Sequence, residues 1–378
     1  MNKFLLSANI VIMLLLLSAC NGKSKSSSDI SNGDTLDIKY AQNITITSLK
    51  DYYIATLRNP WDTTKILHRY ILVDKNVDLP TNIPEGTLVR TPISKAIVYS
   101  SVHMSLLNEL GAFNSIAGVS DLKYINLDNI KEACKKGTII NIGDGMSPDI
   151  EKIIDLHPDA LLLSPFENSG GYGKVDKLNI PIIECADYME TSALGRAEWM
   201  KFYGLLTGKL AQADSIFTHV EQKYNSLSSK ALNTNYKPSV FTELKSSSTW
   251  YVPGGNSTMA KILYDAGANY IFSNNNSSGS VPMSFESVFE KGEKADFWII
   301  KYNQVKDKSY KELKDDYSPY SNFEAFKKRN IYGCNTKNIP FYEESPFHPE
   351  LLLADLIKIF HPEIAEDYEL KYFSKLAE

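Results

Sequence analysis

From residue 96 onward, short apolar runs alternate with stretches of helical periodicity. The runs are rich in Ile, Val and Leu, which predicts buried strands at 96–99, 116–119, 138–141, 160–163 and 180–183. Of the segments between them, 100–110 reads as a helix closed by glycine, and Ser147 and Pro148 suit the N-cap and first turn of another. Strands that alternate with helices predict an α/β fold, with a parallel sheet covered on both faces.

A similar order of elements returns in the second half of the chain. We expect a strand at 240–243, a helix at 259–267 that ends at glycine, a helix at 284–289 and a buried strand at 295–300. The recurrence predicts two similar α/β lobes.

Between the lobes, the spacing of apolar residues predicts two helices. One covers 194–206 and ends at Gly208. In the other, apolar residues recur at steps of three and four from Leu210 to Ala231, a stripe typical of one long helix. About 22 residues at 1.5 Å each give a rod of roughly 33 Å, long enough to bridge two lobes. The alternative is a helix that packs wholly on one domain.

Before residue 91, short runs alternate apolar and polar residues between prolines, which predicts a small β-rich N-terminal extension. We therefore divide the chain into a signal peptide (1–19), a tether (20–35), the β-rich extension (36–90), an N-terminal α/β lobe (91–208), an interlobe helix (209–232) and a C-terminal α/β lobe (233–378).

The first twenty residues have the features of an export signal. Lys3 precedes an apolar run that is too short to span a membrane. The sequence Leu17-Ser-Ala-Cys20 resembles the lipobox of bacterial lipoproteins, which implies that Cys20 is diacylated and becomes the new N-terminus. We expect a protein outside the cytoplasm that is anchored to a membrane by lipid. An ordinary export signal with a chance cysteine is the alternative.

Composition narrows the function further. The 378 residues are 43% hydrophobic and 22% charged with a net charge of -5, which describes a packed protein without the basic surface that nucleic acid requires. The other cysteines, Cys134, Cys185 and Cys334, are odd in number and widely spaced. They fit neither a disulfide framework nor a zinc site.

Three segments carry a resemblance to a known family. Ala96–Asp121 contains a strand, a helix and a Gly-Val-Ser-Asp step, Gly143–Leu163 a glutamate-bearing helix before Pro-Asp-Ala-Leu-Leu-Leu, and Tyr251–Ile300 a second-lobe counterpart. Together with the long helix, they resemble the periplasmic binding proteins that serve ABC importers of vitamin B12, haem and ferric siderophores. The resemblance covers about residues 90–378 and leaves the N-terminal extension without a counterpart.

The resemblance implies two Rossmann-like lobes joined by a single long helix, with a bulky iron- or cobalt-containing ligand between them. It also implies a monomer without a cofactor that delivers this ligand to an ABC permease. The family docks through a glutamate on each lobe, and the matching positions are Glu151 and Glu286. A plain alternative is that glutamate is favoured in the first turn of any helix by the helix dipole.

Ligands of open α/β sheets bind beyond the carboxyl ends of the strands, so the loops there should hold the binding residues. These loops are rich in aromatic side chains, which suit a large flat or cyclic ligand. The candidates are Ser101, His103, Met104, Asp144, Met146, Phe166, Tyr172, Trp250, Tyr251, Tyr302, Asn303, Phe341 and Tyr342. Several of the aromatic residues could equally belong to the core.

Three questions about the ligand stay open. His103 follows the first strand directly and could ligate haem iron or cobalt, or act as a polar wall residue. The scarcity of cationic residues in the loops favours a corrinoid or porphyrin over an anionic siderophore. Two alternatives are a bare-metal carrier, which needs three or four His, Asp or Glu ligands, and a lipoprotein enzyme, for which no Gly-x-Ser-x-Gly motif is present.

Overall fold

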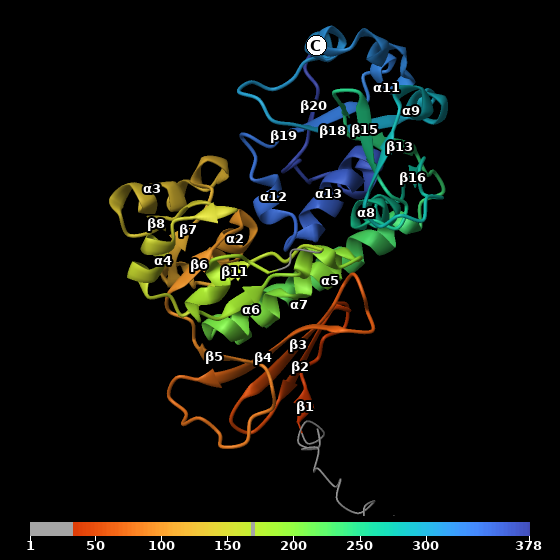
Figure 1. Cartoon of the computed structure of the whole chain (residues 1–378). Helices are drawn as coiled ribbons and strands as arrows, with labels where there is room; N and C mark the ends of the chain where they lie inside the picture. Colours follow the sequence, from red (N-terminus) through yellow and green to blue (C-terminus); the bar gives the residue numbers. More distant parts are fainter. Residues whose placement is uncertain (1–32, 168–170) are drawn as a thin grey trace, which may run out of the picture.

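The computed structural model describes residues 33–167 and 171–378. Figure 1 shows a β-sheet at the N-terminal end, two α/β lobes, and the long helix α7 (Leu210–Leu232) that connects them. The predicted signal peptide, Cys20 and most of the tether lie outside the described residues. Within those residues, no helix combines the length and the apolar character needed to cross a bilayer.

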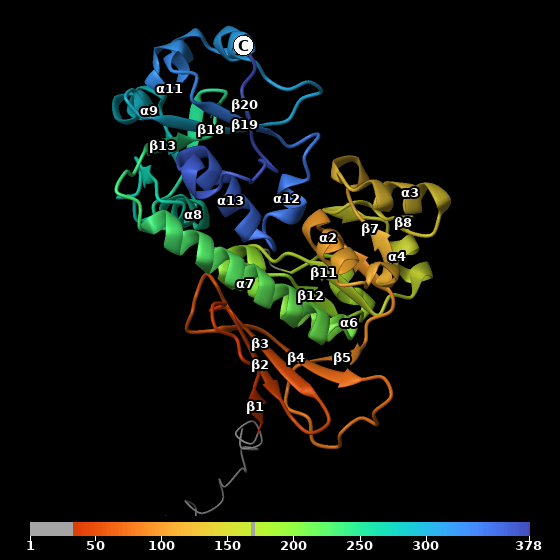
Figure 2. The same cartoon turned by 180° about the vertical axis from the view of Figure 1, so that it is seen from behind.

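The N-terminal sheet has the order β1-β2-β3-β4-β5, and only the pairing of β4 with β5 is parallel. It lies on the side of α6 and α7 that faces away from the second lobe (Figures 1 and 2). Its strands are β1 (Asp34–Thr35), β2 (Ile44–Ser48), β3 (Tyr53–Arg58), β4 (Ile66–Asp74) and β5 (Thr87–Thr91).

The first lobe contains a fully parallel sheet of order β12-β11-β6-β7-β8. Its strands are β6 (Ala96–Val98), β7 (Ile116–Val119), β8 (Ile140–Asn141), β11 (Ala160–Leu163) and β12 (Ile182–Glu184). The helices are α2 (Ser101–Glu109), α3 (Asp128–Lys136) and α4 (Ile150–Leu156), and β9 (Gly143–Asp144) pairs with β10 (Ser147–Pro148) in a hairpin.

The second lobe also contains a five-stranded sheet, in the order β16-β13-β18-β19-β20. Its sheet is formed by β13 (Ser239–Thr242), β16 (Asn269–Tyr270), β18 (Phe297–Tyr302), β19 (Ile331–Asn335) and β20 (Ser374–Lys375). The opening strand is internal in both sheets: β6 lies between β11 and β7, and β13 lies between β16 and β18. The last strand, β20, is antiparallel to β19.

Helices and a second small sheet complete this lobe. The helices are α8 (Thr258–Asp265), α9 (Phe285–Gly292), α10 (Tyr310–Asp316), α11 (Glu324–Lys327), α12 (Phe341–Glu344) and α13 (Pro349–Phe360). The small sheet has the order β14-β15-β17 and consists of Lys245–Ser246, Thr249–Pro253 and Ser280–Met283. The predicted fold, two Rossmann-like α/β lobes joined by one long helix, is confirmed.

Two local predictions are wrong. The expected single helix at 194–206 is divided into α5 (Ala193–Glu198) and α6 (Met200–Thr207), separated at the fully buried Trp199. Helix α4 is capped by Asp149, whose side chain accepts a hydrogen bond from the backbone N–H of Lys152. Ser147 and Pro148 belong instead to the β9–β10 hairpin, because that hairpin folds back over the end of β7.

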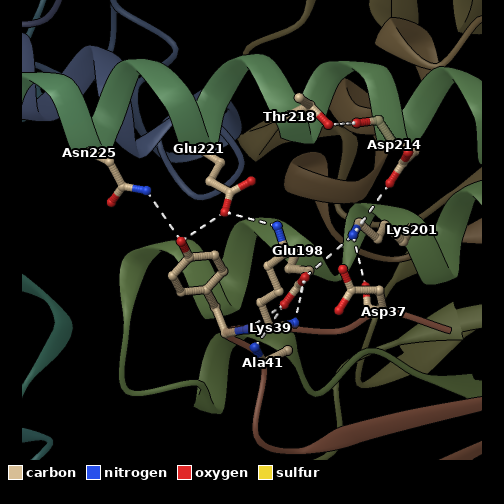
Figure 3. Close-up of polar contacts among 10 residues, drawn as sticks. Asp37, Lys39, Ala41, Glu198, Lys201, Asp214, Thr218, Glu221 and Asn225 are labelled. Carbon is tan, nitrogen blue, oxygen red and sulfur yellow. Dashed lines mark hydrogen bonds and ion pairs between the residues drawn. The ribbon is translucent and has the colours of Figure 1, made fainter. Parts of the chain in front are cut away.

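The segment that leads from β1 to β2 is held on the helices by buried carboxylates (Figure 3). Glu198 is fully buried and accepts hydrogen bonds from the backbone N–H groups of Lys39, Tyr40 and Ala41 at 2.7 to 2.9 Å. Glu221 of α7 accepts from the Tyr40 hydroxyl at 2.8 Å. The N-terminal sheet is thereby fixed to the interlobe helices as well as to the first lobe.

Candidate functional site

A cavity of about 680 Å³ opens at the carboxyl edge of the first lobe's sheet. Its walls come from the segments that follow β6, β7 and β11 and from the β9–β10 hairpin. This volume is within the range of small-molecule sites. The lining residues are Tyr99, Ser100, Ser120, Asp121, Gly145, Met146, Ser147, Pro148, Ile150, Leu163, Ser164, Phe166, Gly171, Tyr172, Gly173, Lys174 and Val175.

Three of the predicted binding residues line this cavity: Met146, Phe166 and Tyr172. Met146 is 83% exposed and Phe166 is 48% exposed, so apolar groups stand open to a ligand. Asp144 lies next to the cavity and accepts a hydrogen bond from the backbone N–H of Met146 at 2.9 Å, which shapes the hairpin turn. The aromatic character expected of the site is present on this lobe.

Met104, His103 and Trp250 are enclosed in the core and do not face the cavity. Met104 and Trp250 are fully buried, and the His103 side chain is 3% exposed. In this arrangement none of them is open to a ligand, so we leave all three out of the site proposed below. His103 lies in the first turn of α2, which directs its side chain inward, toward the core.

The His103 side chain belongs to a buried polar cluster. Its Nε2 atom lies 2.8 Å from Asp187 Oδ1 and 3.0 Å from the Tyr203 hydroxyl. Burial opposes the ionisation of Asp187, but His103 and Arg196 outweigh it and lower the pKa of the carboxyl group to about 2. Asp187 is therefore charged and is paired with His103 and Arg196, and the cluster ties α2 to α5 and α6. The buried Nδ1 atom of His103 has no hydrogen-bond partner among the described residues.

The predicted residues of the second lobe fall into two groups. Tyr251 and Tyr342 are 51% and 53% exposed, and Asn303 is also exposed. Phe341 is buried against the rings of Tyr372 and Phe373, and Tyr302 is 9% exposed. Only the first three are open to a ligand in this arrangement.

The two lobes touch directly where α2 meets α12. The Ser101 hydroxyl donates a hydrogen bond to Glu343 Oε1 at 3.3 Å. His348 Nε2 lies 2.8 Å from Glu109 Oε2 on the first lobe, and His348 Nδ1 lies 3.2 Å from Glu350 Oε1 on the second. We call the Glu109–His348–Glu350 group the interlobe triad. Ser101, a predicted binding residue, takes part in this contact.

The charge state of the triad follows from its geometry. Burial opposes protonation of His348, but hydrogen bonds to Glu109 and Glu350 outweigh it and raise the pKa of the imidazole to about 9. A protonated histidine between two carboxylates links the lobes near neutral pH.

Sequence reasoning missed polar residues on both lobes. Tyr99, Ser120, Asp121 and Ser164 line the cavity and directly follow strands, so the rule that placed the other candidates could have found them. On the second lobe, Glu243 and Lys301 form an ion pair at the ends of β13 and β18. Glu243 has a left-handed backbone with φ of 70°, a conformation that a sequence does not reveal for a residue other than glycine.

The two predicted docking glutamates are in equivalent positions. Glu151 and Glu286 are exposed and lie in the first turns of α4 and α9. The backbone of α9 and the side chain of Ser284 lower the pKa of Glu286. Neither glutamate has an ion-pair partner within the described part of the chain, so both can meet a cation on another protein.

Within residues 33–167 and 171–378, no three His, Cys, Asp or Glu side chains come close enough together to hold a metal ion.

Comparison with known proteins identifies the family. Residues 96–337 match the model of the family described as "Periplasmic binding protein", which is more than half of the chain, and the protein belongs to that family. The match begins after the N-terminal sheet, covers the first lobe and α7, and ends at residue 337, within the second lobe.

Relatives in sequence share nearly the whole chain. This protein is 25% identical over 363 residues to the uncharacterized lipoprotein MJ0878 of Methanocaldococcus jannaschii, and the alignment covers 89% of this chain and 85% of that protein. It is 22% identical to the uncharacterized lipoprotein MJ0872 of the same organism, covering 99% of both. These alignments extend beyond the matched family region, so the N-terminal part is shared as well.

Solved structures share the fold. A possible iron-binding periplasmic protein of Staphylococcus epidermidis aligns with a TM-score of 0.56 at 20% identity, covering 72% of this chain and all of that one. A periplasmic haem-binding protein of Pseudomonas aeruginosa aligns with a TM-score of 0.58 at 15% identity, covering 76% of this chain and 99% of that one. At these identities the likeness concerns the fold alone.

Proposed function

We propose that this protein is an extracytoplasmic solute-binding lipoprotein. It captures a bulky iron- or cobalt-containing ligand, such as a cobalamin, haem or ferric siderophore, and delivers it to an ABC importer. The observation that carries the proposal is the cavity at the strand ends of the first lobe, with Met146, Phe166 and Tyr172 on its wall. Exposed apolar side chains around a preformed cavity favour a large ligand with flat or hydrocarbon surfaces.

The second lobe supports this function with a smaller set of residues. Tyr251, Asn303 and Tyr342 are open, and together with the cavity they would form the ligand surface. Contact between the lobes through Ser101 and Glu343 and through the interlobe triad restrains their relative motion. Binding would therefore need little movement, since the cavity exists in the ligand-free protein.

Docking on the importer would use Glu151 and Glu286. An exposed carboxylate without an ion-pair partner can pair with an arginine on the permease and set the register of the complex. One such residue on each lobe would let the permease sense the relation between the lobes. Replacing either glutamate by glutamine should reduce ligand-dependent ATP hydrolysis by the reconstituted importer and leave ligand affinity unchanged.

Lipidation at Cys20 would keep the protein next to that importer. Support comes from the lipobox in the sequence and from two relatives that are named lipoproteins. Metabolic labelling with a clickable fatty acid should mark the wild-type protein in membranes. The Cys20→Ser variant should remain unlabelled and appear in the soluble extracytoplasmic fraction.

Ligand binding can be tested with residues 21–378, which lack the lipid cysteine. Cyanocobalamin, haemin and ferric siderophores are titrated while tryptophan fluorescence is recorded, and a Phe166→Ala, Met146→Ala double variant tests whether binding uses the cavity. We expect saturable binding of one of these ligands and at least a tenfold loss in the double variant. Failure of every ligand to bind, or turnover of any of them, would contradict the proposal.

A further inference from the structure

The wall of the cavity carries few charged side chains. Among the described residues that line it, the only charged ones are Asp121 and Lys174. None of the described arginines lines the cavity. Arg196, for example, forms an ion pair with Asp187. Lys174 is exposed at the rim, while Asp121 is half-buried at the sheet edge.

Asp121 is held rigidly at the end of β7. Its backbone is left-handed with φ of 54°, and its N–H donates a hydrogen bond to the Gly143 carbonyl at 2.7 Å. One carboxylate oxygen, Oδ2, accepts from the backbone N–H of Gly145 at 3.0 Å. A Cβ atom on residue 145 would lie only 2.6 Å from that oxygen, so this close approach requires glycine. The hairpin and the carboxylate therefore fix each other.

The other carboxylate oxygen, Oδ1, has no hydrogen-bond partner within the described part of the chain and is not enclosed. The carboxylate of Asp121 also acts on the neighbouring Tyr99. Burial, together with Asp121, raises the pKa of Tyr99 to about 12, so the phenol stays neutral. On the opposite lobe, Lys301 is neutralised by Glu243 and supplies no free positive charge.

We propose that Asp121 makes this site select by charge: it accepts ligands that present amide, hydroxyl or ammonium donors and rejects polyanionic ligands. The inference rests on the proposed function and narrows it to neutral or cationic chelates and amide-bearing corrinoids. An anionic group at the sheet edge would face an oriented carboxylate in a partly desolvated wall, where charge repulsion is less screened than in water. A donor group there would gain a charge-assisted hydrogen bond.

The test compares ligands of different charge on residues 21–378. The probes are cyanocobalamin, which is neutral and rich in amides, ferrioxamine B, which carries an ammonium, haemin, and ferric enterobactin, which is a trianion. We expect cyanocobalamin or ferrioxamine B to bind at least tenfold more tightly than either anionic probe. The matched variants are Asp121→Asn, which can still accept from Gly145, and Asp128→Asn, which changes the same charge on a 97% exposed side chain of α3.

Asp121→Asn should reduce the ratio of affinities between the preferred probe and the anionic probes about tenfold, whereas Asp128→Asn should leave this ratio unchanged. If the Asp121 variant does not fold, the wild type alone still decides, because raising the salt concentration should improve binding of the trianion by screening repulsion. Tightest binding of an anionic probe, or an unchanged ratio in a folded Asp121→Asn variant, overturns the inference alone. Absence of binding by all four probes overturns the proposed function, and the inference with it.

Discussion

The two lobes are each built on a five-stranded sheet with an internal opening strand, but they differ in what lies around that sheet. In the first lobe the carboxyl ends of the strands surround an open cavity, and its wall holds an exposed methionine and phenylalanine. In the second, a cluster of five aromatic rings fills the space behind β13 and β18, with centroids 4.8 to 6.1 Å apart: Phe241, Trp250, Trp298, Tyr320 and Phe323. The first lobe leaves a cavity of about 680 Å³ at its strand ends, whereas the second packs aromatic rings around its central strands.

The first lobe obtains its support from outside. The Tyr70 hydroxyl of the N-terminal sheet donates to the Ile182 carbonyl at 3.0 Å and accepts from the Glu184 N–H at 2.8 Å. The backbone N–H of Ile93 donates to the Leu206 carbonyl of α6 at 2.8 Å. The first lobe can therefore keep an open cavity because the N-terminal sheet stabilises it from outside. The second lobe is stabilised by its own aromatic core.

The largest effect is expected for Trp298→Ala, which removes the centre of the second lobe's aromatic cluster. Trp298 is fully buried, and its ring nitrogen donates to the Glu243 carbonyl at 2.8 Å. The free energy of unfolding should fall by about 3–5 kcal/mol, measured by urea denaturation. Met146→Ala on the first lobe should change it by less than about 0.5 kcal/mol, since Met146 is exposed. Equal losses would mean that the lobes are not built differently.

A smaller loss is expected for Glu198→Gln, which tests whether the N-terminal sheet braces the first lobe. Glu198 receives three backbone N–H groups, and Lys201 also lies 3.4 Å from it. An amide can accept fewer of these hydrogen bonds, so unfolding should become easier by about 2–3 kcal/mol. Hydrogen exchange should rise in 37–43 and in the first lobe but not in the second. The exposed Glu132→Gln, on α3, provides a control with the same change in charge.

The interlobe triad should make the free energy of unfolding depend on pH by about 2 kcal/mol. The effect is limited to this size because Glu109 is partly exposed to solvent and only Glu350 is fully enclosed. The folded pKa of His348, about 9, lies above its ordinary value of 6.5. The stabilisation is therefore fully present below pH 6.5 and is lost as the pH rises through 9. Thermal unfolding of wild type and His348→Gln should differ at pH 6 and converge at pH 10. A constant difference across this range would contradict the prediction.

The smallest effect is expected at Tyr99, on the cavity wall. Its hydroxyl is enclosed and lacks a hydrogen-bond partner among the described residues. Tyr99→Phe removes this unsatisfied group, so stability should stay the same or rise by up to about 1 kcal/mol. A drop of more than about 1 kcal/mol in urea unfolding would show that the hydroxyl has a partner in solution.

The elements that sequence predicts best are those with strong periodicity. Helix α7 covers Leu210–Leu232, as its apolar stripe indicated, and the four-residue apolar runs at 116–119 and 160–163 are strands. Periodicity fails where tertiary contact decides the outcome. The helix is interrupted at the buried Trp199, whose ring nitrogen donates to Glu190, and Ser147–Pro148 pair with β9 instead of starting a helix.

Candidate site residues are harder to predict than the fold, since strand-end loops hold inward and outward side chains in alternation. His103 and Phe166 both follow strands, yet one is buried against Asp187 and the other is exposed. Nothing in the local sequence distinguishes them, because the direction of each depends on the first turn of the following segment. Asp121 follows β7 directly and the same rule could have included it, but the hydrogen bond that orients its carboxylate comes from Gly145, twenty-four residues away.

The grip of Glu198 on the segment before β2 has a mechanical consequence. If the protein is anchored through Cys20, any drag on it reaches the folded part through β1, which is paired with β2 over only two residue positions. Under load, those two pairs would separate one after the other. The three hydrogen bonds to Glu198 come next along the chain and would have to shear together. Pulling on the anchor should therefore peel β1 away and then stall, which leaves the ligand-bearing lobes undisturbed.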